Sequence, residues 1–232
     1  MKRFFLVLTF LMFCLGCKEK PTTPKPKPDK VVFNQELAME LEKMKEVDQI
    51  AAYIPQGEYT KMSKEEWNAF KDSVFTTHQK RIEEIFENHG FVGYDLAGEE
   101  GSNNFWLIAQ HSDHDPEFQK KILDAMKIEV DKRNASPKYY AFLVDRVNLN
   151  MGKEQVYGTQ FDYNEMGQAF PKNMSDTTGV DLRRLRMGLI PMIDRMNEMT
   201  VSHFIMNQEY FHQKGITTPV LYAKKYGGNP QN

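Results

Sequence analysis

Cysteine is almost absent from this chain. It has only 2 cysteines, Cys14 and Cys17, and both lie near the N-terminus. The rest of the chain therefore offers no disulfide, no thiolate metal site and no cysteine nucleophile. A domain in residues 18–232 has to be stabilised by its apolar core, for which 16 Phe, 14 Met and 10 Tyr are available.

Positive charge is not in excess either. The chain carries 30 basic and 32 acidic residues, for a formal charge of −2. Nucleic-acid binders concentrate Lys and Arg on one face, so we expect no nucleic-acid partner. The sequence also lacks a P-loop, a dinucleotide fingerprint, a nucleophile elbow and the helical H-E-x-x-H zinc motif. The sequence therefore does not tell which cofactor, if any, the protein uses.

Long apolar runs are missing as well, and the one short run has a distinctive setting. Lys2 and Arg3 precede an apolar stretch that ends at Phe13, about half of the roughly 20 residues that a membrane span needs. A basic start, a short apolar run and a small residue before a cleavage point are typical of a secretory signal. A transmembrane anchor is the less favoured interpretation.

The end of this run, Leu15-Gly16-Cys17, resembles the lipobox of bacterial lipoproteins. The resemblance implies that residues 1–16 are a cleaved signal peptide and that Cys17 is lipidated. Cys17 would then attach the protein to a membrane of the bacterial cell envelope, with the membrane and its face left open. Residues 17–32 are rich in Pro and Lys, a composition that favours an extended spacer.

Beyond the linker, apolar residues recur mainly at helical spacing. We expect a mainly α, single multi-helix domain over residues 33–226 with one small β-hairpin, followed by a frayed tail at 227–232. We expect Trp106, Leu107, Phe118, Ile122, Tyr140 and Leu143 to be buried together. The expected elements are a helix at 34–52, a helix from a capping box at Ser63 to about Phe86, a loop at 90–102, a short helix around Phe105, helices starting at Asp115-Pro116 and Ser136-Pro137, a hairpin at 155–172, a helix from Asp181 that breaks at Pro191, and a last helix at 198–213.

The densest polar cluster spans residues 110–115 and lies between two expected helices. His111, Asp113 and Asp115 are candidate catalytic residues, and His111 and Asp115 are candidate metal ligands. A helix junction uses the same residue types, with an aspartate as N-cap of the next helix. The cap interpretation is the favoured one.

Asp145 and Arg146 are adjacent on an expected helix, so their side chains do not face each other. Each is expected to have a distant partner, and a fold-fixing ion pair is the favoured role. Asp145 is also a candidate catalytic residue, and Arg146 a candidate clamp for an anionic ligand group.

The segment from Gln155 to Gln160 carries several hydrogen-bonding side chains. In a strand, Gln155, Tyr157 and Thr159 would share one face and Gln160 would point to the other. With Arg146, these four form the candidate ligand-binding set. The alternative interpretation is a buried polar network.

Two expectations concern how these groups assemble. We expect His111, Asp145, Arg146, Tyr157 and Gln160 to border one polar pocket. We expect the arginines at 183, 184 and 186 to form a solvated or ion-paired helix face.

Five stretches together resemble an uncharacterised bacterial domain family that occurs in cytoplasmic and lipoprotein forms. The resemblance marks the polar residues above as the candidate site and implies no activity. Ser112 stands where the family usually has alanine. The stretches are residues 106–113 (WLIAQHSD), 115–119 (DPEFQ), 141–147 (AFLVDRV), 152–160 (GKEQVYGTQ) and 180–191 (VDLRRLRMGLIP).

The sequence thus predicts a membrane-anchored envelope lipoprotein that acts as a binding or accessory domain with a polar pocket. One alternative is a hydrolase-type enzyme with a His/Asp/Arg site, assisted or not by a metal. Another is a protein-interaction or immunity-type module. The expected partners are the membrane, through lipidated Cys17, and a small-molecule or protein ligand.

Overall fold

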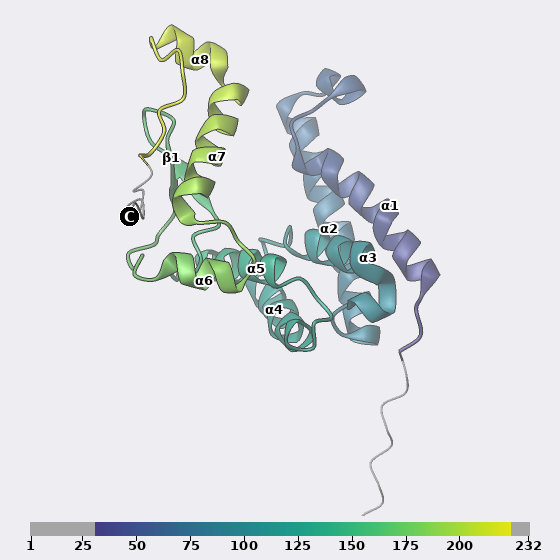
Figure 1. The fold of residues 1–232 in the computed structure, drawn as a ribbon. Coiled ribbons are helices and arrows are strands. Elements are labelled where there is room, and N and C mark those ends of the chain that lie inside the picture. The colour runs from purple at the N-terminus through teal and green to yellow at the C-terminus, as the bar shows by residue number, and fades with distance from the viewer. Residues whose placement is uncertain (1–30, 224–232) are drawn as a thin grey trace, which may run out of the picture. The chain divides into compact units, whose positions relative to one another are not determined.

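The computed structural model describes residues 31–223. The expected signal peptide, lipidated Cys17, most of the linker and the tail at 227–232 lie outside these residues. The described part is mainly helical with one small antiparallel β-hairpin, which confirms the predicted fold class (Figure 1). The elements are α1 (Gln35–Ala52), the 3-10 turn η1 (Gly57–Lys61), α2 (Lys64–His89), α3 (Tyr94–Ala109), α4 (Pro116–Asp131), α5 (Pro137–Asn150), β1 (Phe161–Tyr163), β2 (Ala169–Pro171), α6 (Val180–Arg186), α7 (Met192–Met206) and α8 (Gln208–Gln213).

Three helices begin at the residues predicted from their capping signals. Ser63 and Glu66 form a capping box, in which the serine accepts from the Glu66 amide while the glutamate accepts from the Ser63 amide. Asp115 and Ser136 cap α4 and α5, and each is followed by proline in the first turn. These contacts span three residues, so sequence alone suffices to place them.

The expected loop at 90–102 is wrong, because most of it belongs to α3. Gly98 has a φ of 72° and a non-helical backbone, so it kinks this helix. A Cβ on Gly101 would lie 2.7 Å from the Ala97 Cβ and 3.6 Å from the Ala38 Cα on α1. A side chain at 101 would therefore clash with Ala97 across the kink, while Ala38 lies at ordinary contact distance, so these small residues belong to a kinked helix and do not mark a loop.

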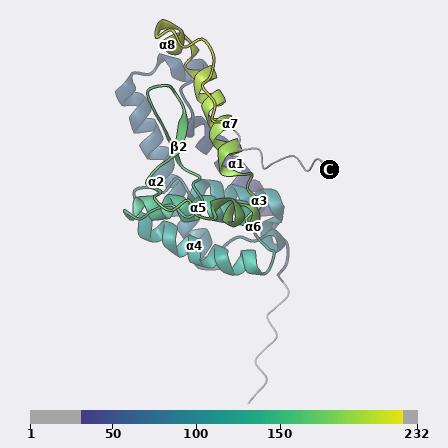
Figure 2. The ribbon, with the colours of Figure 1, turned by 60° about the vertical axis from the view of Figure 1, so that its left-hand side comes forward.

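The predicted hairpin is real but shorter than expected. Its strands pair in the register Phe161 with Pro171 and Tyr163 with Ala169. Residues 155–160 form an irregular loop with Gly158 at a φ of +63°, so the alternation of faces assumed for this segment does not apply. Figure 2 shows the hairpin beside α7, and the Ala169 amide donates to the Thr200 hydroxyl of that helix at 2.9 Å.

The predicted break at Pro191 is confirmed, since α6 ends before it and α7 begins directly after it. The helix expected at 198–213 is instead two: α7 starts earlier, and α8 follows after Asn207. No helix within residues 31–223 has the length and apolar character needed to cross a bilayer.

The main core is formed by the facing sides of α1 to α5. Of the six residues expected in it, four are buried, while Leu107 and Tyr140 are partly buried and pack against the others. A smaller cluster of Ala141, Tyr157 and Leu189 joins α5 to the 155–160 loop and the segment after α6. The two clusters meet through Phe142 and Val144, so α5 is the link between the core and this loop.

Candidate functional site

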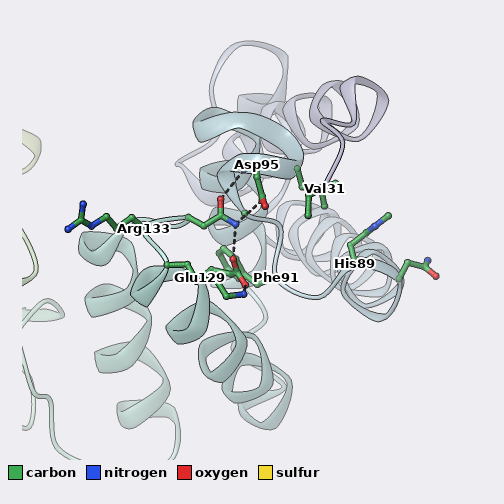
Figure 3. Close-up of a pocket in the computed structure, with 11 residues that line it drawn as sticks. Val31, His89, Phe91, Asp95, Glu129 and Arg133 are labelled. Atoms are coloured by element: carbon green, nitrogen blue, oxygen red, sulfur yellow. Dashed lines mark hydrogen bonds and ion pairs between the residues drawn. The ribbon is translucent and has the colours of Figure 1, made fainter. Parts of the chain in front are cut away.

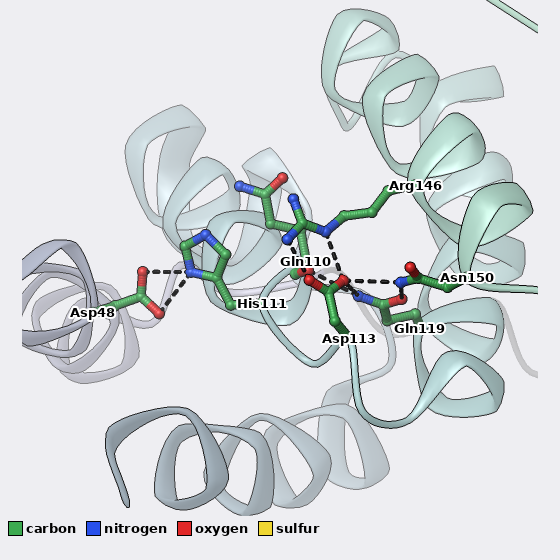
Figure 4. A network of polar contacts seen from close by, with 7 residues as sticks. All are labelled: Asp48, Gln110, His111, Asp113, Gln119, Arg146 and Asn150. Carbon is green, nitrogen blue, oxygen red and sulfur yellow. Dashed lines mark hydrogen bonds and ion pairs between the residues drawn. The ribbon is translucent and has the colours of Figure 1, made fainter. Parts of the chain in front are cut away.

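His111 is held by a partner that the sequence did not suggest. The carboxylate of Asp48, fully buried on α1, accepts from His111 Nδ1 at 2.8 and 3.0 Å (Figure 4). A carboxylate only accepts, so Nδ1 carries a proton and donates, and no hydrogen bond among residues 31–223 uses Nε2. Burial disfavours the charged form of Asp48, but the contacts with His111, His78 and Gln49 together outweigh burial, and the pKa of Asp48 is lowered.

A signal for Asp48 is present in the sequence. It continues the helical spacing of Leu37, Leu41 and Ala51 on the buried face of α1. A charged residue in an apolar stripe is rarely buried without a partner, so this position predicts a buried contact. His78 of α2 lies nearby, with its Nδ1 at 3.8 Å from the Asp48 carboxylate.

Asp113 and Arg146 form the ion pair favoured for Arg146. Arg146 donates from Nε at 2.7 Å and from Nη2 at 2.5 Å to the two carboxylate oxygens. Asn150 and Gln119 also donate to Asp113, at 2.9 and 3.1 Å. Burial alone would raise the pKa of Asp113, but these contacts, led by Arg146, lower it. Figure 4 shows Asp48 and the Asp113 group on the two sides of His111.

Asp115 takes the cap role. Its carboxylate accepts from the Phe118 amide at 3.0 Å and from the Gln79 side chain at 3.3 Å. Within residues 31–223, no group of three or more potential His, Cys, Asp or Glu ligands is placed to hold a metal ion. His111 and Asp115 therefore serve separate contacts in this structure.

Asp145 organises the 155–160 loop. Its fully buried carboxylate accepts from the backbone amides of Val156 at 2.7 Å, Tyr157 at 3.0 Å and Thr159 at 2.8 Å. Burial raises the pKa of Asp145, and the three amide donors oppose that rise. The backbone of this loop is thus bound to α5 by one side chain.

The buried side chain of Gln155 also binds the backbone of this loop. Its side chain accepts from the Gln160 amide at 2.8 Å and donates to the carbonyls of Gln160 and Lys172, at 2.9 and 2.5 Å. Of the two interpretations for this segment, the buried network describes Gln155. Thr159 and Gln160 remain half-buried at the loop surface.

Arg184 corrects the expectation of a solvated arginine face, because it is only 1% exposed. Its Nη1 donates to the carbonyls of Tyr157 at 2.7 Å and Gly158 at 3.1 Å. Its Nε donates to the carbonyl of Ile190 at 2.7 Å. Asp145 therefore binds the amides of the loop while Arg184 binds its carbonyls. On this helix it is the apolar neighbour Leu185 that faces solvent, with 71% of its surface exposed.

A cavity of about 270 Å³ lies against this loop. Thr159 is the one residue of the predicted ligand-binding set that lines it, and Arg184 forms part of its wall. The other lining residues are Lys138, Phe142, Gly188, Leu189, Ile190, Arg195 and Glu198.

A larger hollow of about 580 Å³ lies near Val31, but three of its polar residues, Asp95, Glu129 and Asn134, bind one another (Figure 3). Asn134 donates to Asp95 and to Glu129, both at 2.7 Å, and accepts from the Asp95 amide. The Arg133 side chain extends away from this group in Figure 3. Asn134, in the segment after α4, therefore links α3 to α4 at this hollow.

The five residues expected around one pocket divide between two networks. His111 and Arg146 belong to the α3–α4 junction, which we call the junction network: Asp48, Gln110, His111, Asp113, Gln119, Arg146 and Asn150. The second network is that of the 155–160 loop. It contains Tyr157 and Gln160 of the loop itself and Asp145 of α5, which binds the loop amides. The division follows from α5, whose adjacent residues Asp145 and Arg146 bind different segments.

These features define a helical domain with a side-chain-clamped loop beside a small cavity. Residues 35–203 match the model of a family described as "Family of unknown function (DUF6624)". The chain belongs to this family, as the resemblance to an uncharacterised domain family predicted. Searches of curated proteins and of solved structures found no match.

Proposed function

We propose that the protein is a lipid-anchored envelope lipoprotein whose helical domain binds a small molecule in the cavity beside the 155–160 loop. The observation that carries the binding role is the double clamp on this loop. Asp145 holds its amides and Arg184 its carbonyls, so the loop wall of the cavity is fixed before a ligand arrives. Preorganisation of this kind lowers the cost of binding.

The cavity has the mixed character of small-molecule sites. Phe142, Leu189 and Ile190 supply apolar surface, while Thr159 contributes a hydroxyl. Its volume of about 270 Å³ lies just below the usual range for drug-sized ligands, so it suits a small metabolite.

A thermal-shift screen of small metabolites on the full chain, purified in a mild non-ionic detergent, tests the binding role. A ligand of this cavity should raise the melting temperature, because it binds only the folded state. Phe142→Ala should remove that rise, whereas Phe170→Ala, a change at an exposed hairpin position, should keep it. A ligand whose effect survives Phe142→Ala would bind elsewhere.

The anchor is tested separately with Cys17→Ser. Acyl chains supply about 0.8 kcal/mol per buried CH₂, so the variant should lose lipid labelling and leave the membrane fraction. If it still pellets with membranes after a high-salt wash, the anchor lies elsewhere.

A hydrolase-type enzyme is the second candidate, favoured by the Asp48–His111 contact. A buried carboxylate that fixes one imidazole nitrogen leaves the other available as a general base. His111→Gln should then abolish turnover in a screen of ester and phosphoester substrates. Equal activity in the variant and the natural protein would assign the contact to folding alone.

A further inference from the structure

Arg184 is a buried cation without a contact counter-ion. Within residues 31–223, no carboxylate lies within 4.0 Å of its guanidinium nitrogens, although the side chain is only 1% exposed. Buried charges in proteins are normally paired, because removing a charge from water is costly. Burial accordingly lowers the pKa of Arg184, while Asp181 and Asp145 oppose this from a greater distance.

One edge of this guanidinium remains unused. Nε and Nη1 make the bonds to Ile190 and the 155–160 loop, and no hydrogen bond among the described residues uses Nη2. Arg184 lines the 270 Å³ cavity. The cavity is therefore where the missing partner can approach this side chain.

The rest of the lining reinforces that charge. Lys138 and Arg195 add two cations, and Glu198 is the single carboxylate among the lining residues. Glu198 accepts from Arg195 Nη1 at 3.0 Å on a partly exposed surface, a setting in which ion pairs are weak. An incoming anion can compete for Arg195 at little cost.

We propose that the cavity binds a small organic anion, whose carboxylate or phosphate pairs with Arg184, Arg195 and Lys138. Its apolar part contacts Phe142, Leu189 and Ile190, and the Thr159 hydroxyl supplies a neutral hydrogen-bonding group. This inference rests on the proposed binding function and names the class of ligand. A charge-assisted hydrogen bond to arginine is about twice as strong as a neutral one, so the anionic group dominates recognition.

The test is calorimetric titration of the full chain in mild non-ionic detergent with four probes. Phenyl phosphate and benzoate carry the anion on an apolar ring, and benzyl alcohol and benzamide are their neutral counterparts. We expect one site for an anion, binding at least about tenfold weaker for the neutral compounds, and weakening with added salt. Tighter binding of phenyl phosphate than of benzoate indicates that the ligand carries a phosphate, and the reverse order indicates a carboxylate.

Variants outside the loop clamp assign the site. Arg195→Gln and Lys138→Gln should each weaken anion binding about two- to fivefold, because both side chains are at least partly exposed and water weakens such charge pairs. Arg186→Gln is the matched control, because Arg186 is an exposed arginine at the end of α6 that does not line the cavity. Glu198→Gln should strengthen binding, since it removes the competing carboxylate.

Three results would overturn the inference. These are equal binding of neutral and anionic probes, an Arg186→Gln effect as large as that of Arg195→Gln, and no heat from either anion up to millimolar concentration. In each case the metabolite screen still decides the binding function on its own. If a neutral metabolite raises the melting temperature and Phe142→Ala removes that rise, the binding function stands and the proposal of an anionic ligand is wrong.

Discussion

Replacing Asp145 with alanine should destabilise the protein strongly. The change removes the acceptor of three backbone amides, at 2.7, 3.0 and 2.8 Å, in a fully buried position. Hydrogen bonds to a charged group contribute roughly 1.5–3 kcal/mol each, so the sum sets an upper bound near 9 kcal/mol. Removing the carboxylate also removes the cost of burying its charge, which brings the expected loss to about 3–5 kcal/mol.

Urea unfolding followed by circular dichroism measures this loss directly. For a domain of this size, each kcal/mol shifts the melting temperature by about 2–4 °C, so we expect a fall of roughly 6–20 °C. Asp113→Ala is the control: that carboxylate also accepts several bonds, but its side chain is 47% exposed, and such pairs contribute about 0–1 kcal/mol. If Asp145→Ala costs no more than Asp113→Ala, the loop clamp does not stabilise the fold as argued.

Three further predictions concern the loop, the core and acid stability. Gly158→Ala places a Cβ 2.1 Å from the Met192 Cε at a φ of +63°, and should lower the free energy of unfolding by about 2–4 kcal/mol. Gly152→Ala, at a φ of +72° with open space around it, should lower it by only about 1–2 kcal/mol. Equal losses for the two variants in urea unfolding would refute the steric argument. Phe118→Ala should cost about 3–5 kcal/mol, and an unchanged melting temperature would mean that its helix face is not part of the core. Because the folded pKa of Asp113 lies below its unfolded value, its ion pair stabilises the fold above about pH 4 and stops doing so as the pH falls through the folded pKa. The melting-temperature gap between the natural protein and Asp113→Asn should therefore close in acid, and a gap that stays constant down to pH 2 would contradict this.

The order of the helices could be read from the sequence because its signals are local. The capping box at Ser63 and the caps at Asp115 and Ser136 each act over three residues, and Pro191 lies directly before α7 as its N-cap. The glycines of residues 90–102 led to the wrong prediction of a loop there. Gly98 kinks α3 without ending it, and Gly101 leaves room for Ala97 across that kink, so these glycines shape a helix and do not form a loop.

Of the predicted ligand-binding residues, only Thr159 lines the proposed cavity, and Arg184 and Phe142 in its wall were not predicted as site residues. His111, Arg146 and Thr159 were singled out for their chemistry, and each lies in a polar network or cavity wall. The expected grouping of His111, Asp145, Arg146, Tyr157 and Gln160 in one pocket failed because Asp145 and Arg146, adjacent on α5, bind different segments of the chain.

The sequence by itself determined the mainly helical class, the starts of α2, α4 and α5, the presence of a hairpin and most of the apolar faces, since these depend on residues a few positions apart. Only the tertiary structure decided which partners the buried charges have. The Asp48–His111 bond joins residues 63 positions apart, and Arg184 is buried because a distant loop offers it carbonyls. Burial of a charge depends on a partner brought close by folding, and that partner leaves no mark in the local pattern.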